Sequence, residues 1–203
     1  MRVSVGLRAA LSSAVAIVVI TAVFGFGYPL LATGFAQLAF AHQANGSLVT
    51  VNGKVVGSSL AAQGFSGPRY FHERPSATSP AYNAGATTFA NLGPTNSQLA
   101  KNVRAAIASV LSLERPYNPG LTVRDIPVDA VTTSGSGIDP DISPAYALLQ
   151  AHRVAEVRHM SLAAVHRLIS ENTDGRSLDF FGEPGVNVLK LNLALDRAQG
   201  KAS

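Results

Sequence analysis

Near its N-terminus the chain carries an uncharged apolar run, AALSSAVAIVVITAVFGFGYPLL, from Ala9 to Leu31. As an α-helix this run reaches about 34 Å, enough to cross a hydrocarbon core of about 30 Å. A buried core helix would seldom need so long an unpatterned stretch. A cleaved signal peptide is the other alternative, because Ala39-Phe40-Ala41 is a small-x-small site, but the run exceeds the usual apolar region of about 7–15 residues. We therefore expect a permanent anchor that Pro29 bends or ends.

The charges that flank this run predict its orientation. Arg2 and Arg8 precede it, and the next formal charge is Lys54. Because positive charge stays on the cytoplasmic side, the N-terminus is expected to lie inside. The predicted organisation is a cytoplasmic segment over 1–8, a transmembrane helix over 9–31 in contact with membrane lipid, and an extracytoplasmic domain over 32–203.

Composition excludes several classes of protein. The chain has 203 residues and no cysteine, which removes disulfides, thiolate zinc sites and cysteine nucleophiles from consideration. Its net charge of +4 comes from 16 basic and 12 acidic residues, and two of the basic ones precede the anchor. Nucleic-acid binding needs a clustered basic face, so we expect no nucleic-acid partner.

The remaining sequence mixes helical and strand patterns. Asn52-Gly53 lies between two alternating segments and predicts a hairpin. Residues 64–94 are rich in proline and glycine and predict a long ordered loop, a feature that is often functional. A helix is expected after it, capped by Thr95 or Asn96, with one apolar face: Leu99, Val103, Ala106, Ile107 and Val110.

Toward the C-terminus, DIPVDAVTT predicts a strand that leads into the segment VTTSGSGIDPDISP. Ser143-Pro144 predicts the start of a helix that runs to about His159, and a second helix is expected from Ser161 to before Gly175. VNVLKLNLAL alternates in its first half and predicts another strand. Such a mixture fits an α+β or α/β domain, and we expect α+β, a mixed sheet with helices, behind one transmembrane helix.

The SGSG segment, formed by Ser134, Gly135, Ser136 and Gly137, invites comparison with phosphate-binding loops. Its four backbone amides could form an anion nest. A P-loop would need Lys followed by Ser or Thr after the second glycine, and Ile138 and Asp139 stand there instead. Asp139 and Asp141 would repel a phosphate, so a turn between a strand and a helix is the favoured interpretation.

Other candidate sites are weak. The elbow G-x-S-x-G that would expose Ser134 or Ser136 as a nucleophile is absent, and we expect no catalytic residue. Three side chains at helical spacing could share a metal, namely His152, Glu156 and His159, but Arg153 and Arg158 beside them predict a solvated face, so we expect no metal site. His72-Glu73-Arg74 fits either a partner contact or a solvated loop.

Several stretches in order resemble one family. They are YPLLATGFAQLAF, HQANGSLV, VVGSSLAAQGF, YFHERPSA, YNAGATTFANLGPTN, IPVDAVTTSGSGIDPDISPAYALLQAHRVAEVR and GEPGVNVLKLNLALD, and they cover most of 28–196. Together they are similar to the C subunit of the bacterial Kdp potassium-importing P-type ATPase. Two local departures are ATTF before NLGPTN, where a serine-glycine run is expected, and Gly185, where an arginine is usual.

The resemblance implies an accessory subunit in the bacterial inner membrane. Its implied partners are a channel-like potassium-binding subunit, an ATP-hydrolysing P-type subunit and a small membrane peptide. The implied role is assembly of the complex and, as a catalytic chaperone, a higher ATP affinity of the hydrolysing subunit. The chain lacks the Asp-Lys-Thr-Gly phosphorylation motif, so we expect it not to be the enzyme.

Two modes of action follow from this resemblance. In one, the exported domain acts through contact with other subunits; in the other, the SGSG segment touches ATP as a cofactor shared with the hydrolysing subunit. The predicted topology favours contact, because an external domain does not meet cytoplasmic ATP. The expected interface comprises Arg74, Pro75, Asn91, Gly93 and Asn96, together with the SGSG segment. An anchored extracytoplasmic hydrolase or ligand-binding module is the alternative outside transport.

Overall fold

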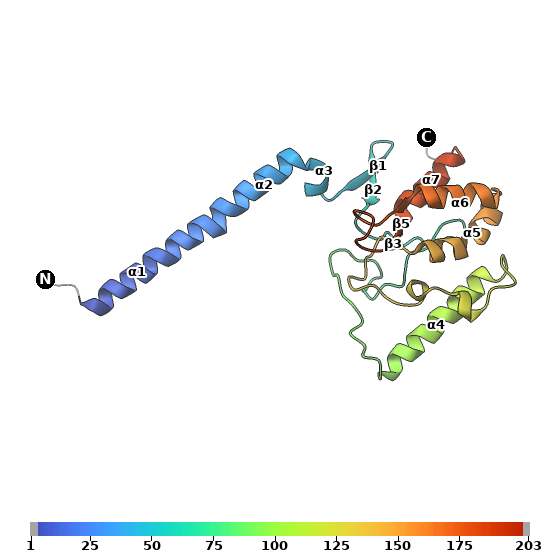
Figure 1. Cartoon of the computed structure of the whole chain (residues 1–203), viewed down its shortest axis with the longest axis horizontal. Coiled ribbons are helices and arrows are strands. Elements are labelled where there is room, and N and C mark those ends of the chain that lie inside the picture. Colours follow the sequence, from blue (N-terminus) through green and yellow to red (C-terminus); the bar gives the residue numbers. More distant parts are fainter. Residues whose placement is uncertain (1–3, 201–203) are drawn as a thin grey trace. The chain divides into compact units, whose positions relative to one another are not determined.

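The computed structural model describes residues 4–200, which form two compact units that divide between Ser47 and Leu48. The first unit is helical: α1 (Val5–Ile20), a π-helical stretch η1 (Thr21–Gly27) and α2 (Tyr28–Ala39) follow one another without a break (Figure 1), and the short α3 (Ala41–Ala44) follows. The second unit combines small antiparallel sheets with packed helices, so the predicted α+β class is confirmed.

The N-terminal helix is long and apolar enough to cross a membrane from Val5 to Ala39. This helix is apolar on nearly all sides and none of its residues is buried by the rest of the described chain, as suits a helix able to span a membrane. The helix does not end at Pro29. Instead the π-helical stretch precedes it, where the Tyr28 N–H bonds the Val23 carbonyl, because proline cannot donate and its ring crowds the carbonyl four residues back.

The second unit begins with the predicted hairpin. Strands β1 (Leu48–Val51) and β2 (Lys54–Ser58) pair antiparallel, with Val51 opposite Lys54. Asn52 and Gly53 have φ values of 51° and 74°, the left-handed conformation that both central residues of a type I′ turn require.

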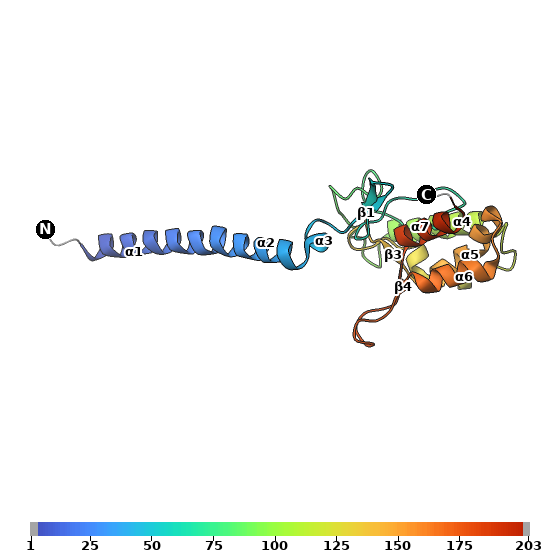
Figure 2. The same cartoon turned by 90° about the horizontal axis from the view of Figure 1, so that it is seen from above.

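Three helices and a small sheet form the core. Helix α5 (Pro144–Arg158) packs on α6 (Leu162–Glu171), and α7 (Val188–Ala198) packs on α6 (Figures 1 and 2). The sheet has the order β3-β5-β4, with β3 (Asp141–Ile142), β4 (Thr173–Asp174) and β5 (Gly185–Asn187) antiparallel. Many of the fully buried side chains here are aliphatic: Val154, Val165, Val186, Val188, Leu191 and Leu195.

Local capping explains where these helices begin. Ser143 Oγ accepts the Tyr146 N–H at 3.0 Å with Pro144 in the first turn, as predicted, and α5 ends at His159 in the left-handed conformation. Helix α4 (Ser97–Glu114) begins at Asn96, whose Oδ1 accepts the Gln98 N–H at 2.8 Å. Of the two caps considered for this helix, Asn96 is the one used.

Two predicted strands are wrong. VNVLKLNLAL contributes only its first two residues to β5 and then forms α7, because Asn187 caps the helix through Lys190 N–H and the buried side chains of Val188, Leu191 and Leu195 recur at helical spacing. DIPVDAVTT forms no strand: the 3-10 turn Val123–Asp125 ends at its first residue, and the 3-10 turn Val128–Ala130 lies within it.

The predicted long loop is present, since no helix or strand occurs between Ser58 and Ser97 in the described chain. Side chains of the core helices bind its backbone. The Asn192 amide of α7 pairs with both the N–H and the carbonyl of Phe71, at 2.8 and 2.9 Å. The Gln150 amide of α5 pairs in the same way with His72, at 2.8 and 3.0 Å. Side chains of α5 and α7 therefore bond loop backbone groups that a neighbouring strand would bond in a sheet.

Two buried arginines of α5 complete this attachment. Arg153 donates to the Tyr70 carbonyl at 2.8 Å, to the Pro68 carbonyl and to Glu114 of α4 at 2.9 Å. Arg158 donates to the Arg69 carbonyl at 2.6 Å and to Asp196 of α7 at 2.9 Å. The prediction that Arg153 and Arg158 lie on a solvated face is wrong, because both guanidinium groups bind loop carbonyls that are remote in sequence.

Candidate functional site

The SGSG segment is a loop whose polar groups form hydrogen bonds within the segment and with nearby backbone groups. Ser134 is buried, and its Oγ accepts the Gly137 N–H at 2.9 Å. Ser136 Oγ accepts the Ile138 N–H at 3.2 Å, and the Ser136 carbonyl accepts the Thr88 N–H at 3.1 Å. One of the four amides of the predicted anion nest is thus already satisfied, and both serine hydroxyl oxygens stabilise the turn.

Gly137 fixes this loop against the long loop. Its φ is +74°, and a Cβ there would lie 2.7 Å from the Thr88 carbonyl oxygen and 2.8 Å from Thr78 Cγ2. The Gly137 carbonyl also accepts the Ser76 hydroxyl at 2.6 Å. Only glycine suits both the backbone conformation and the close approach. Gly135 is different, because it is exposed and a Cβ there would meet nothing within 4 Å.

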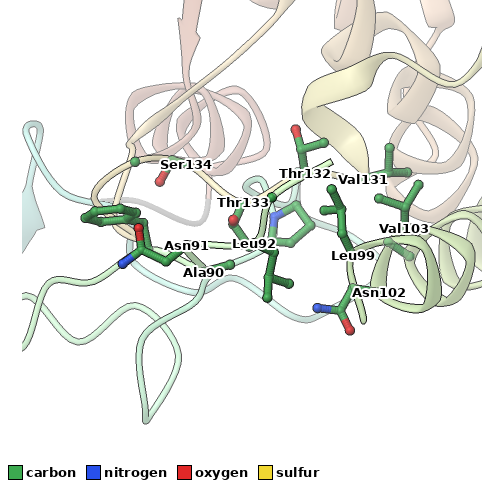
Figure 3. A pocket seen from close by; sticks show the side chains of 15 residues that line it. Ala90, Asn91, Leu92, Leu99, Asn102, Val103, Val131, Thr132, Thr133 and Ser134 are labelled. Atoms are coloured by element: carbon green, nitrogen blue, oxygen red, sulfur yellow. The ribbon is translucent and has the colours of Figure 1, made fainter. Parts of the chain in front are cut away.

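A cavity of about 560 Å³ lies beside this loop. Three chain segments form it: the long loop near Asn91, the N-terminal half of α4, and Val131 to Gly135 (Figure 3). Its walls are mostly apolar and include Leu92, Leu99, Val103, Ala106 and Val131. Of the predicted site residues, the cavity brings together Pro75, Asn91, Gly93, Ser134 and Gly135.

The cavity is electrically neutral. None of the described residues that line it is charged, and its polar side chains are Asn91, Asn102, Thr132, Thr133 and Ser134. A nucleotide phosphate would meet no cation among these residues, whereas phosphate sites combine amide donors with positive charge or a metal. An apolar wall with a few amides and hydroxyls suits a segment of another polypeptide better than a polyanion.

Arg74 does not line this cavity. Its Nη1 pairs with Asp139 at 3.1 Å, and its Nη2 lies 3.4 Å from both Thr132 Oγ1 and the Thr133 carbonyl. The Arg74 side chain therefore ties the long loop to the segment on both sides of SGSG. This contact also gives Asp139 a role, because its carboxylate neutralises the partly buried guanidinium of Arg74.

The other predicted interface residue outside the cavity is Asn96, whose side chain caps α4 as described above. Ser136 and Gly137 also lie outside the cavity lining, since they bond within the loops. The residues that sequence reasoning missed are apolar, chiefly Leu92 and Val131. The signal for part of this wall is the predicted apolar face of α4, because Leu99, Val103 and Ala106 on that face are half-buried and line the cavity.

The remaining motifs serve the fold. Glu73 is buried, and its carboxylate accepts the Gln63 and Phe65 N–H groups at 3.1 Å each; burial raises its pKa, while these hydrogen bonds oppose the increase. Burial also disfavours the charged form of His72 and so lowers the pKa of its imidazole, whose Nε2 lies 2.9 Å from the Gly67 carbonyl. His72, Glu73 and Arg74 therefore all bond within the domain, and the expected contact of Arg74 with a partner stays a prediction.

The spaced residues His152, Glu156 and His159 do not form a site. His152, Glu156 and His159 are all exposed, and His159 lies beyond the last residue of α5. Among residues 4–200, no three side chains of His, Asp or Glu come together in a way that would hold a metal ion. The described residues that line the cavity likewise include no histidine to serve as a base for Ser134.

The comparison with known families decides the identity. A family model described as K+-transporting ATPase, c chain (KdpC), matches residues 10–197. The chain belongs to the KdpC family. Relatives named potassium-transporting ATPase KdpC subunit include one from Methylococcus capsulatus, 55% identical over 87% of this chain and 90% of the relative. Another from Sorangium cellulosum is 53% identical over 91% and 95%, and one from Acidobacterium capsulatum is 50% identical over 92% and 97%.

Family membership covers both structural units. The matched range extends from the apolar helix into α7, so the anchor and the domain with the cavity are both part of what this family shares. The chain is thus a membrane-associated member of this family with one N-terminal helix that can span a membrane.

Proposed function

We propose that this chain is a non-catalytic accessory subunit of an ATP-driven potassium import complex and that it acts through contact with the other subunits. By holding the complex in a competent state it raises the ATP affinity of the ATP-hydrolysing subunit, as a catalytic chaperone does. An effect of this kind is a coupling free energy between separate sites, typically about 1–3 kcal/mol. Membership of the family and the names of the relatives support the assignment to this complex.

The observation that carries the mode of action is the neutral, apolar cavity beside the SGSG segment. Its described lining lacks a cation, and Gly137 N–H is already bonded to Ser134. Both features disfavour direct ATP binding by the isolated chain and favour contact with a polypeptide segment. The expected contact surface comprises five residues that line the cavity: Pro75, Asn91, Gly93, Ser134 and Gly135. Arg74 stabilises the loops next to it through Asp139, and Asn96 stabilises it by capping α4.

The proposed partners are the channel-like potassium-binding subunit, the ATP-hydrolysing P-type subunit and the small membrane peptide. In the proposed topology the N-terminus with Arg2 and Arg8 lies in the cytoplasm, and the domain from residue 48 onward lies outside the inner membrane. The domain therefore meets the external surface of its partners, while ATP binds on the opposite side of the membrane.

Co-purification on a tagged full-length chain tests this proposal. The wild type is expected to retain both large partners from detergent-solubilised membranes. Gly135 lines the cavity and a Cβ there meets nothing within 4 Å, so Gly135→Trp adds a bulky side chain at the expected contact surface and is expected to reduce recovery of the partners about tenfold. Gly120→Trp is the matched control, because Gly120 is also exposed, has no positive φ and has only Asn118 near its Cβ direction.

Direct ATP contact predicts a different result. In that case photoreactive ATP would label the purified chain, and Ser134→Ala with Ser136→Ala would lower the labelling. If labelling of this kind occurs, or if Gly135→Trp and Gly120→Trp retain partners as well as the wild type does, contact through the cavity is wrong.

A further inference from the structure

The segment between β4 and β5 forms a second feature that the cavity does not involve. Residues 175–184 project from the small sheet as a narrow hairpin (Figure 2). Its tip exposes three large apolar side chains, Leu178, Phe180 and Phe181, whose exposed fractions are 77%, 65% and 59%. Three such residues within four positions make a concentrated apolar surface rather than scattered exposure.

Backbone hydrogen bonds and an ion pair hold the two sides of the hairpin together below this tip. Ser177 and Phe181 exchange both backbone hydrogen bonds at 2.9 Å, and Arg176 pairs with Glu183 at 2.8 Å across the neck. At the base, Val186 of β5 is fully buried between β3 and β4. The centroids of the Phe180 and Phe181 rings lie 4.1 Å apart, so the tip is a compact aromatic pair on a braced stem.

The charges around the tip indicate what covers it. From Asp174 to Pro184 the chain carries three carboxylates, Asp174, Asp179 and Glu183, and one arginine, Arg176. Asp179 lies between Leu178 and the aromatic pair. Insertion into a bilayer would bring this carboxylate into an apolar phase and close to anionic headgroups, both of which are unfavourable. The charge pattern therefore favours a protein surface over lipid.

A second copy of the chain is also unsuitable as the occupant. Stable interfaces bury about 800 Å² on each partner, far more than a tip of three side chains supplies. A small aromatic tip instead resembles an anchor that enters a pocket at the centre of a larger interface. Contact between this domain and the other subunits of the proposed complex would supply such an interface.

We propose that the Leu178-Phe180-Phe181 tip inserts into an apolar pocket on the extracytoplasmic surface of another subunit of the complex, beside a basic side chain that pairs with Asp179. This inference rests on the proposed function, because it requires the complex. The tip gives the domain a second attachment that is separate from the cavity, and two attachments together restrict its orientation far more than either one alone.

The difference in tryptophan emission between the complex with the variant and the complex with the wild-type chain tests the proposal, because the wild-type chain contains no tryptophan and its complex supplies the signal of the partners alone. Phe180→Trp in the full-length chain is expected to shift its emission to shorter wavelength and to resist acrylamide when the complex forms. Val123→Trp, at a position that is 52% exposed on the turn after α4, is expected to show neither change. Brominated phospholipids quench the indole introduced by Phe180→Trp only if the tip enters lipid, and such quenching would overturn the proposal.

Recovery of the complex separates this inference from the proposed function. Phe180→Ser with Phe181→Ser is expected to reduce partner recovery about tenfold, and Asp179→Lys is expected to reduce it as well. Urea unfolding of both variants should match the wild type, because the replaced side chains are exposed. If the wild type captures partners and these variants capture them equally, the tip is not an attachment. If the wild type captures none, the proposed function fails, and this inference fails with it.

Discussion

Arg153→Met is expected to destabilise the second structural unit by about 3–5 kcal/mol, because it leaves a buried carboxylate without its partner. The side chains of Arg153 and Glu114 are 0% and 2% exposed, and their charged atoms lie 2.9 Å apart. The same substitution removes the donors for the carbonyls of Pro68 and Tyr70. A loss of this size is a large share of a typical stability of about 5–15 kcal/mol.

The pH dependence gives a sharper signature of the same contact. Burial raises the pKa of Glu114 above its ordinary value of 4.5, and the charge and hydrogen bond of Arg153 oppose that increase. Without Arg153 the folded-state pKa rises further. A raised carboxyl pKa means that the folded state binds more protons, so stability falls as pH rises from the ordinary value through the folded one. Arg153→Met should therefore regain stability relative to the wild type as pH is lowered toward 4.5.

Urea unfolding of the full-length chain in detergent, followed by tyrosine fluorescence and circular dichroism, measures both effects. With a denaturant slope of about 1–3 kcal/mol per molar, the midpoint should fall by about 2 M. Adding Glu114→Gln to Arg153→Met should restore part of the loss, since coupled pairs interact by about 0.5–3 kcal/mol. If Arg153→Met stays within about 1 kcal/mol of the wild type with unchanged pH dependence, the buried pair does not hold the loop.

Three further predictions concern the glycines, the loop attachment and the topology. Gly137→Ala should destabilise the chain by about 2 kcal/mol or more through strain and steric overlap, whereas Gly135→Ala should be nearly neutral, and equal urea midpoints would contradict this. Asn192→Ala leaves both backbone groups of Phe71 without the Asn192 amide and should cost about 2–4 kcal/mol in the same assay; a loss under about 1 kcal/mol would contradict the attachment. A cysteine introduced by Lys54→Cys should react with an impermeant maleimide in intact spheroplasts, and labelling only after lysis would reverse the topology.

Local signals explain which parts of the fold could be predicted. Asn52-Gly53 fixes its turn through two left-handed residues, and Ser143-Pro144 starts α5 through its own hydroxyl and ring, so neither depends on distant contacts. VNVLKLNLAL satisfies both an alternating and a helical pattern. Its outcome depends on Asn187, which lies in β5 and also caps α7, and a single pattern does not reveal that role.

The buried arginines show why the rest could not be predicted. Arg153 and Arg158 look like exposed helix residues until their acceptors are known, and those acceptors are carbonyls of the irregular loop, far away in the sequence. The candidate site depends on the same distant pairing. SGSG and the proline- and glycine-rich loop were both identified, but only the fold shows that Asn91 and Gly93 share a cavity with Ser134 and Gly135.

The most direct test of the account is the ATP concentration that gives half-maximal potassium-stimulated ATPase activity in the purified complex. It should be measured with the wild-type chain, with Gly135→Trp and with Gly120→Trp, using the fraction of complex that remains assembled. Contact through the cavity predicts that Gly135→Trp raises this concentration about fivefold or more while Gly120→Trp leaves it unchanged. The same value for all three complexes would contradict the claim that this face of the chain sets the ATP affinity of its partner.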